Sequence, residues 1–264
     1  MFPTPDEIEQ NPQDYTHIVF LPGTLCDAAL FAPQLAKLNR QQCSVADLTQ
    51  DDTIAGMARR VLDSAPPHFS LVGLSMGGIV AFEIMRQAPQ RVLDVFLLDT
   101  TYLPMNDEKK RGYQRFVDMA ARGDMGQVVD EMIAGGLVSE ARRSDTTLVN
   151  TVRDMCLRVG ADAFTRQAHA IMNRCDYTNV LQSWPYDVTL NVGENDPWCT
   201  VDMHQKMAAL FPNPAHITVI KECGHLSTLE KPHVVNTNIN SWLMLRYIRL
   251  IMRAENYHQE TENL

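Results

Sequence analysis

The chain has 264 residues, of which 45% are hydrophobic, 21% charged and 7% aromatic. These fractions lie near the globular average and therefore argue against a disordered, collagen-like or proline-rich chain. The 23 lysines and arginines against 32 aspartates and glutamates give a net charge of −9, which disfavours nucleic acid as a partner.

Residues 1–15 are acidic, polar and interrupted by prolines, so we expect an N-terminal arm. The arm has neither the basic region nor the apolar run of a secretory signal, and no stretch of the chain approaches the ~18 uninterrupted apolar residues of a membrane span. The six cysteines lie far apart, without the spacing of metal ligands. We therefore predict a reduced, cytoplasmic protein with no metal, no cofactor and no integral membrane span.

Strands and helices alternate in the first hundred residues. An apolar run closed by Pro-Gly predicts a buried strand at residues 17–23. The elements that follow are a helix over 28–39, a strand at 43–48, a helix capped by Asp52 or Thr53 that ends near Ser64, a strand ending at Val72, a helix ended by Pro89 and a strand at 92–100. Such apolar strands alternating with helices are typical of a parallel sheet covered on both faces.

From about Tyr102 to Ser183 the patterns are helical only. Strands resume at residues 186–193 and 216–224, and Pro232 begins a final helix that runs to about Arg253. We expect an α/β fold with about six parallel strands, helices on both faces and a helical cap inserted into the core. The predicted parts are the arm at residues 1–15, the core at residues 16–101 and 184–264, and the cap at residues 102–183.

The most informative motif is Gly73-Leu74-Ser75-Met76-Gly77, which satisfies G-x-S-x-G between a predicted strand and a predicted helix. A sharp strand-to-helix turn strains the backbone of Ser75, so the positions two before and two after it must lack bulk. The turn would hold the Ser75 hydroxyl at the carboxyl end of the sheet and aim a helix N-terminus at an oxyanion formed there. The alternative is a glycine-rich turn that only packs a helix on a strand.

With this motif in place, the chain resembles the capped, esterase- or lactonase-like serine hydrolases of the α/β-hydrolase superfamily over roughly residues 16–243. The resemblance implies a nucleophile, an acid and a base in that chain order, each just past a strand. It implies that Ser75 is the nucleophile, Asp196 in Gly193-Glu194-Asn195-Asp196-Pro197 the acid, and His225 in Cys223-Gly224-His225 the base. Asp99, after the strand that ends at Leu98, is the rival acid, and Glu194 is a weaker rival.

The resemblance also implies an oxyanion hole made of two backbone N–H groups. One belongs to Met76, which follows the nucleophile, and the other to Thr24, in the loop after the first strand. Most of the family has His-Gly where this chain has Pro22-Gly23. Pro22 is not the expected donor, so the hole should survive, but the usual histidine brace of the loop is missing.

These assignments predict a serine hydrolase that cleaves a carboxylic ester of a small or medium acyl substrate through an acyl-enzyme on Ser75. A lactonase or thioesterase with the same Ser-His-Asp triad is an alternative, and so is a non-hydrolytic ligand-binding protein of this fold. The cap should select the small-molecule substrate. Its arginines could meet a substrate carboxylate or be solvated or paired; they are Arg153, Arg158, Arg166 and Arg174.

The final helix carries an apolar stripe at helical spacing and is longer than the fold requires. Packing on the sheet accounts for its first half. For the rest we expect a homodimer contact or docking to a surface. The stripe consists of Ile239, Trp242, Leu243, Tyr247, Leu250 and Ile251.

Overall fold

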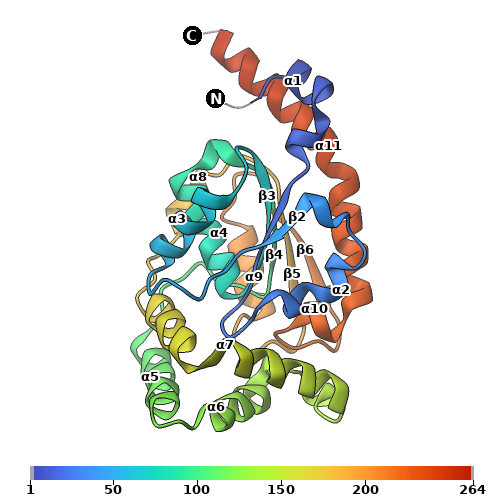
Figure 1. The fold of residues 1–264 in the computed structure, drawn as a ribbon. Helices are drawn as coiled ribbons and strands as arrows, with labels where there is room; N and C mark the ends of the chain where they lie inside the picture. Colours follow the sequence, from blue (N-terminus) through green and yellow to red (C-terminus); the bar gives the residue numbers. More distant parts are fainter. Residues whose placement is uncertain (1–2, 263–264) are drawn as a thin grey trace.

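The computed structural model describes residues 3–262, apart from the side chains of residues 12, 13, 247, 253 and 256–262. At its centre is a six-stranded sheet in the order β2-β1-β3-β4-β5-β6, with all neighbouring strands parallel (Figure 1). The predicted α/β fold class and the predicted number of strands are therefore confirmed. The strands are β1 (Ile18–Leu21), β2 (Cys43–Val45), β3 (Phe69–Leu74), β4 (Val92–Leu98), β5 (Val188–Gly193) and β6 (His216–Ile220).

Helices cover both faces of the sheet, which explains why its strands are apolar throughout. Successive side chains of a strand point to opposite faces, and Ile18 and Phe20 join one hydrophobic core whereas Val19 and Leu21 join the other. The first core lies under α2 (Ala32–Leu35), α10 (Ser227–Glu230) and α11 (Pro232–Glu262). The second lies under α3 (Ile54–Ser64), α4 (Met76–Gln87), α8 (Thr178–Ser183) and α9 (Val201–Ala208) (Figure 1).

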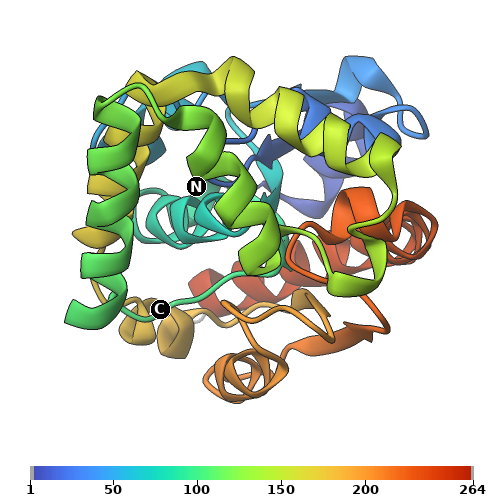
Figure 2. The same cartoon turned by 90° about the horizontal axis from the view of Figure 1, so that it is seen from below.

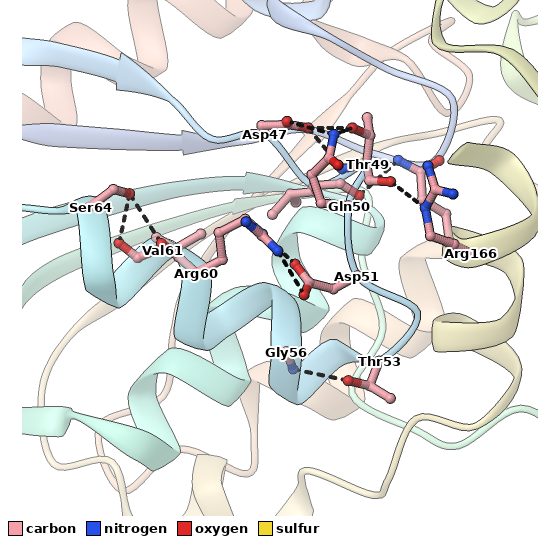
Figure 3. Close-up of polar contacts among 12 residues, drawn as sticks. Asp47, Thr49, Gln50, Asp51, Thr53, Gly56, Arg60, Val61, Ser64 and Arg166 are labelled. Carbon is pink, nitrogen blue, oxygen red and sulfur yellow. Dashed lines mark hydrogen bonds and ion pairs between the residues drawn. The ribbon is translucent and has the colours of Figure 1, made fainter. Parts of the chain in front are cut away.

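The start of α3 is fixed by its own sequence. Of the two predicted capping residues, Thr53 is the one used: its Oγ1 accepts a hydrogen bond from the Gly56 N–H at 3.1 Å (Figure 3). Just before it, Asp51 pairs with Arg60 of the helix at 2.6 Å (Figure 3). The loop between β2 and α3 is thereby held against the first turns of the helix.

The inserted segment forms helices α5 (Asp107–Ala121), α6 (Met125–Met132) and α7 (Thr146–Met172), which pack on one another. They lie together beyond one end of the sheet, and Figure 2 views them from below. No strand occurs in residues 102–183, all of which the structure describes. The last helix of the segment, α8, packs on α4 instead. The division of the chain into arm, core and cap stays a prediction.

The predicted N-terminal arm contains the helix α1 (Pro5–Gln10), which a capping box between Thr4 and Glu7 begins. Its Ile8 is fully buried in a small core with Leu93, Leu250 and Ala254. The arm is therefore docked against the far end of α11 (Figure 1). No helix in residues 3–262 is long and apolar enough to cross a membrane.

The apolar stripe predicted on the final helix faces the chain itself. Ile239, Trp242 and Leu250 are buried, and Leu243 and Ile251 are partly buried against the same cores. The side chain of Tyr247 lies outside the described residues. A different row of apolar side chains on α11 is exposed by 54–79%, and we call it the exposed row: Met244, Leu245, Ile248 and Met252.

Candidate active site

Ser75 lies in the turn between β3 and α4 with a φ of 55° and a ψ of −118°. Residues other than glycine rarely adopt this backbone conformation. The turn closes only because its neighbours are glycines. A Cβ on Gly77 would lie 1.9 Å from the Leu21 carbonyl oxygen of β1, and one on Gly73 would lie 2.8 Å from the Gly77 oxygen. The Thr100 hydroxyl donates to the Ser75 carbonyl at 2.7 Å, which fixes the strained residue further.

The structure brings the three predicted triad residues together, although Ser75 and His225 are 150 residues apart in the chain and Asp196 and His225 are 29 apart. Ser75 Oγ lies 2.8 Å from His225 Nε2, and His225 Nδ1 lies 2.7 Å from Asp196 Oδ2. Asp196 and His225 are each only 4% exposed. A neutral imidazole that donates from Nδ1 to the carboxylate can accept the serine proton at Nε2. The arrangement can therefore move a proton away from Ser75.

The loops that carry Asp196 and His225 pack directly on each other. A Cβ on Gly193 would lie 2.2 Å from the Gly224 carbonyl oxygen, so only glycine permits this approach. The other oxygen of Asp196, Oδ1, accepts the Trp198 and Cys199 N–H groups at 2.9 and 3.1 Å. These bonds orient the carboxylate so that Oδ2 faces the imidazole.

Asp99, the rival acid, is fully buried but makes no hydrogen bond to His225. Its Oδ1 accepts the Gly193 N–H at 2.7 Å, and its Oδ2 accepts the Ser227 hydroxyl. Burial, together with the nearby Asp196 carboxylate, raises the pKa of Asp99 to about 8. The raised pKa favours the protonated form of Asp99, and the acid that contacts the imidazole is Asp196.

Glu194, the weaker rival, lies on the outer side of the same loop. It forms an ion pair with Lys221 at 2.6 Å and also accepts the Glu222 N–H at 3.1 Å. The bond from Lys221 lowers the pKa of the Glu194 carboxyl. This residue holds the loop to the end of β6 and does not contact the imidazole.

The pKa of His225 is set by opposing effects. Burial lowers it, but the charge of Asp196 and the hydrogen bond that His225 donates to Asp196 outweigh burial and raise the pKa above its ordinary value of 6.5. A strengthened base suits a residue that must take a proton from a hydroxyl group.

Two backbone N–H groups were predicted to form an oxyanion hole, those of Thr24 and Met76. Within residues 3–262 neither has a hydrogen-bond acceptor. The loop of Thr24 is braced from the cap: the fully buried Gln167 of α7 accepts the Leu25 N–H at 2.9 Å and donates to the Leu48 carbonyl at 3.1 Å. Gln167 thus holds the loop that lacks the usual histidine brace.

A cavity of about 230 Å³ opens above the triad. Lys109, Tyr113 and Phe116 of α5 line one part of it, and Ile171 at the end of α7 lines another. It is lined by Ser75, Met76, Ile79, Thr101, Met105, Lys109, Gly112, Tyr113, Phe116, Met132, Ile171, Arg174, Trp198, Cys199 and His225. Ser75 and His225 therefore face a space that a small molecule can occupy.

The family model described as the alpha/beta hydrolase family matches residues 18–237. The chain belongs to the alpha/beta hydrolase family. No curated protein matches the sequence significantly. The match runs from the first predicted core segment, through the helices that follow, into the second segment as far as residue 237, and it includes all five predicted site residues.

Solved structures of other alpha/beta hydrolases share this fold at low sequence identity. They include a thermophilic esterase from Thermogutta terrifontis with malate bound (24% identity, 88% of this chain and 90% of that chain, TM-score 0.79). Another is the enol-lactonase from Burkholderia xenovorans LB400 (17% identity, 87% of this chain and 92% of that chain, TM-score 0.77). A third is the esterase EaEST from Exiguobacterium antarcticum (15% identity, 87% of this chain and 92% of that chain, TM-score 0.73). At these identities the likeness shows the fold.

One further side chain that supports the hydrolase site was missed in the sequence. Glu230 is buried, and its Oε1 accepts the Gly224 N–H at 3.0 Å and the Ser139 N–H at 3.2 Å. It joins the loop of His225 to the cap segment. The available sequence signal was only a carboxylate five residues after His225, in Leu226-Ser227-Thr228-Leu229-Glu230.

In residues 3–262, the one cluster of side chains that could hold a metal ion is Asp196, Cys199 and His225. Their ligand atoms lie within 4.8 Å of one another. Asp196 and His225 are already bonded to each other, so an ion here would compete with the triad hydrogen bond.

The assignment of the acid is tested with two matched variants. We expect Asp196→Asn to lower kcat by about 10⁴-fold, because an amide holds the imidazole in the wrong tautomer. Asp99→Asn should keep kcat within about tenfold, because the amide mimics a protonated carboxyl toward Gly193 and Ser227. Steady-state kinetics on one ester measures both effects, and the reverse order would assign the acid to Asp99.

The pH dependence follows from the raised pKa of His225. Only the neutral imidazole accepts the Ser75 proton, so kcat/KM should fall as the pH drops through this pKa. We expect the acid limb of the pH profile to have its midpoint above 6.5. A midpoint below that value would mean that Asp196 does not stabilise the imidazolium in the free enzyme.

Proposed function

We propose that this alpha/beta hydrolase is a serine hydrolase that cleaves a carboxylic ester of a small or medium acyl substrate. The observation that carries the proposal is the continuous hydrogen-bond chain from Ser75 Oγ through His225 to Asp196, with distances of 2.8 and 2.7 Å. Its nucleophile end faces a cavity of about 230 Å³. A hydroxyl needs such a base, because it is a weak nucleophile at neutral pH.

In the proposed mechanism, Ser75 Oγ attacks the ester carbonyl while His225 Nε2 takes the hydroxyl proton. The N–H groups of Thr24 and Met76 stabilise the oxyanion, each by about 3 kcal/mol. His225 then returns the proton to the leaving alkoxide, and the C–O bond breaks to give an alcohol and an acyl-Ser75 ester. Water, deprotonated by His225, then attacks the acyl carbonyl. The bond between the acyl carbon and Ser75 Oγ breaks, His225 returns the proton to Ser75 Oγ, and the carboxylic acid leaves. Asp196 stabilises the imidazolium in both halves.

Lactones and thioesters present the same electrophilic carbonyl, so the same residues would act on them. The structural relatives described as esterases and as an enol-lactonase support both directions. A ligand-binding protein without turnover is the competing class. It would retain the cavity but would not form a covalent adduct on Ser75.

We also propose that the protein works in a reducing compartment such as the cytoplasm. All six cysteines are free. Burial raises the pKa of the Cys26 and Cys199 thiols, which keeps both of them in the unreactive protonated form.

The enzyme and binding-protein proposals are separated by active-site labelling. We expect the wild type to hydrolyse short 4-nitrophenyl esters and to be labelled by a fluorophosphonate on the Ser75 peptide. Ser75→Ala should lose the label and all but the residual rate that binding and the oxyanion hole provide. Mass spectrometry locates the adduct. A wild type with neither turnover nor label would leave only the binding class.

The predicted stripe of the final helix packs within the chain itself. We therefore propose that a homodimer forms through the exposed row of the same helix. An uncovered apolar row on one helix face is typical of a contact surface. Light scattering should give twice the mass of one chain, and Ile248→Lys should give a monomer. A monomeric wild type would contradict the proposal.

A further inference from the structure

The cavity above Ser75 contains two cationic residues and no acidic one. Arg174, just after α7, and Lys109, in the first turn of α5, both line it. None of its fifteen lining residues is an aspartate or a glutamate. The cavity is therefore a positively charged space with otherwise mainly apolar walls.

Arg174 is only partly satisfied by the protein. Its Nε donates to the Leu103 carbonyl at 2.7 Å, and its Nη1 donates to the Ile171 carbonyl at 3.1 Å. A guanidinium has five N–H donors, so three have no acceptor within the described part of the chain. Burial lowers the pKa of Arg174, because a desolvated cation without a carboxylate is costly. An anionic ligand would relieve that cost.

The other arginines of the predicted cap are engaged elsewhere, so Arg174 differs from them. Of the four that the sequence suggested, three have partners outside the cavity. Arg153 pairs with Asp130, Arg158 with Asp27 at 2.8 Å, and Arg166 with the Thr49 carbonyl at 2.8 Å (Figure 3). Only Arg174 among these four lines the cavity.

Cys199 lines the same cavity as Arg174 and Lys109 and lies beside Asp196 and His225. Its Sγ lies within 4.8 Å of the ligand atoms of Asp196 and His225. Burial and the Asp196 charge raise the pKa of the Cys199 thiol, and the charges of Arg174 and Lys109 oppose them. Arg174, Lys109 and Ser75 line one cavity of about 230 Å³. A single small molecule in that cavity can therefore present a carbonyl to Ser75 and an anion to Arg174.

We propose that Arg174 and Lys109 form an anion subsite and that the substrate is an ester or lactone bearing a carboxylate a few bonds from its scissile carbonyl. This inference rests on the proposed hydrolase function and names its substrate class. The planar guanidinium matches a carboxylate with two parallel hydrogen bonds, and the more exposed Lys109 adds a point charge. The competing role for Arg174 is to bind the last carbonyls of α7 and no more.

The substrate class is tested with two esters of similar length. Mono-4-nitrophenyl glutarate carries a carboxylate, and 4-nitrophenyl hexanoate is neutral. We expect the wild type to prefer the glutarate, and Arg174→Met to lower its kcat/KM roughly 10- to 100-fold, with a much smaller loss for the hexanoate. Arg153→Met is the matched control and should leave both values unchanged. An equal loss of kcat/KM on both esters in Arg174→Met would mean that Arg174 only caps α7, and it would overturn the subsite.

A binding measurement separates the subsite from the chemistry. We expect glutarate to bind Ser75→Ala in calorimetry and to lose that binding when Arg174→Met is added. If the wild type shows neither turnover nor label, such Arg174-dependent binding would support the subsite while the proposed hydrolysis is refuted.

If Arg174→Met fails to fold, Lys109→Met at the more exposed position replaces it, and weaker glutarate binding is expected. Inorganic phosphate serves as the second anion. Binding of phosphate but not glutarate would overturn the carboxylate assignment. Glutarate binding that neither Arg174 nor Lys109 affects would overturn the subsite itself.

Discussion

The close approach between the first turn of α4 and the end of β1 is the constraint on which the rest of the site depends. Gly77 lies so near the Leu21 carbonyl that a single Cβ atom there would be 1.9 Å from the oxygen. This contact lets the chain reverse from β3 into α4 within one residue, and Ser75 occupies that residue with a positive φ. The strain is local, and the buried sheet around it maintains the turn.

The same principle joins the other two loops. Gly193 and Gly224 let the turns after β5 and β6 touch through their backbones, and this sets the separation of Asp196 from His225. Two buried carboxyl groups then hold the backbone of these turns in place. Glu230 accepts the Gly224 N–H, and Asp99 accepts the Gly193 N–H. Burial and the nearby Asp196 raise the pKa of Asp99, which favours the neutral form of this second carboxyl group.

Much of this arrangement could be predicted from sequence, because short motifs specify backbone shape locally. The G-x-S-x-G turn and the loops of Asp196 and His225 each follow an apolar strand, and parallel strands bring their carboxyl ends to one edge. The same reasoning placed Thr53 as one of two caps of α3. The number of strands was correct because each of the six apolar runs forms one strand. The almost continuous apolar character of these runs indicated helices on both faces of the sheet.

What could not be predicted depends on contacts between distant segments. Gln167 braces the loop at Leu25 from 142 residues away, and nothing in its helical neighbourhood distinguishes it from a surface glutamine. Four cap arginines looked alike in sequence, and only partners elsewhere in the fold separate Arg174 from the other three. For the second half of the stripe on α11 the sequence left a dimer contact or docking to a surface open, whereas Leu250 and Ile251 of that half pack against Ile8 of α1.

The central claim is that Ser75 and His225 act as one unit in the proton transfer. The most direct measurement is kcat for a single ester in Ser75→Ala, His225→Ala and the double variant. We predict that each single variant loses several orders of magnitude and that the double variant is no slower than either, since a unit already broken cannot be broken again. Losses that multiply in the double variant, or a Ser75→Ala enzyme that retains its rate, would contradict the claim.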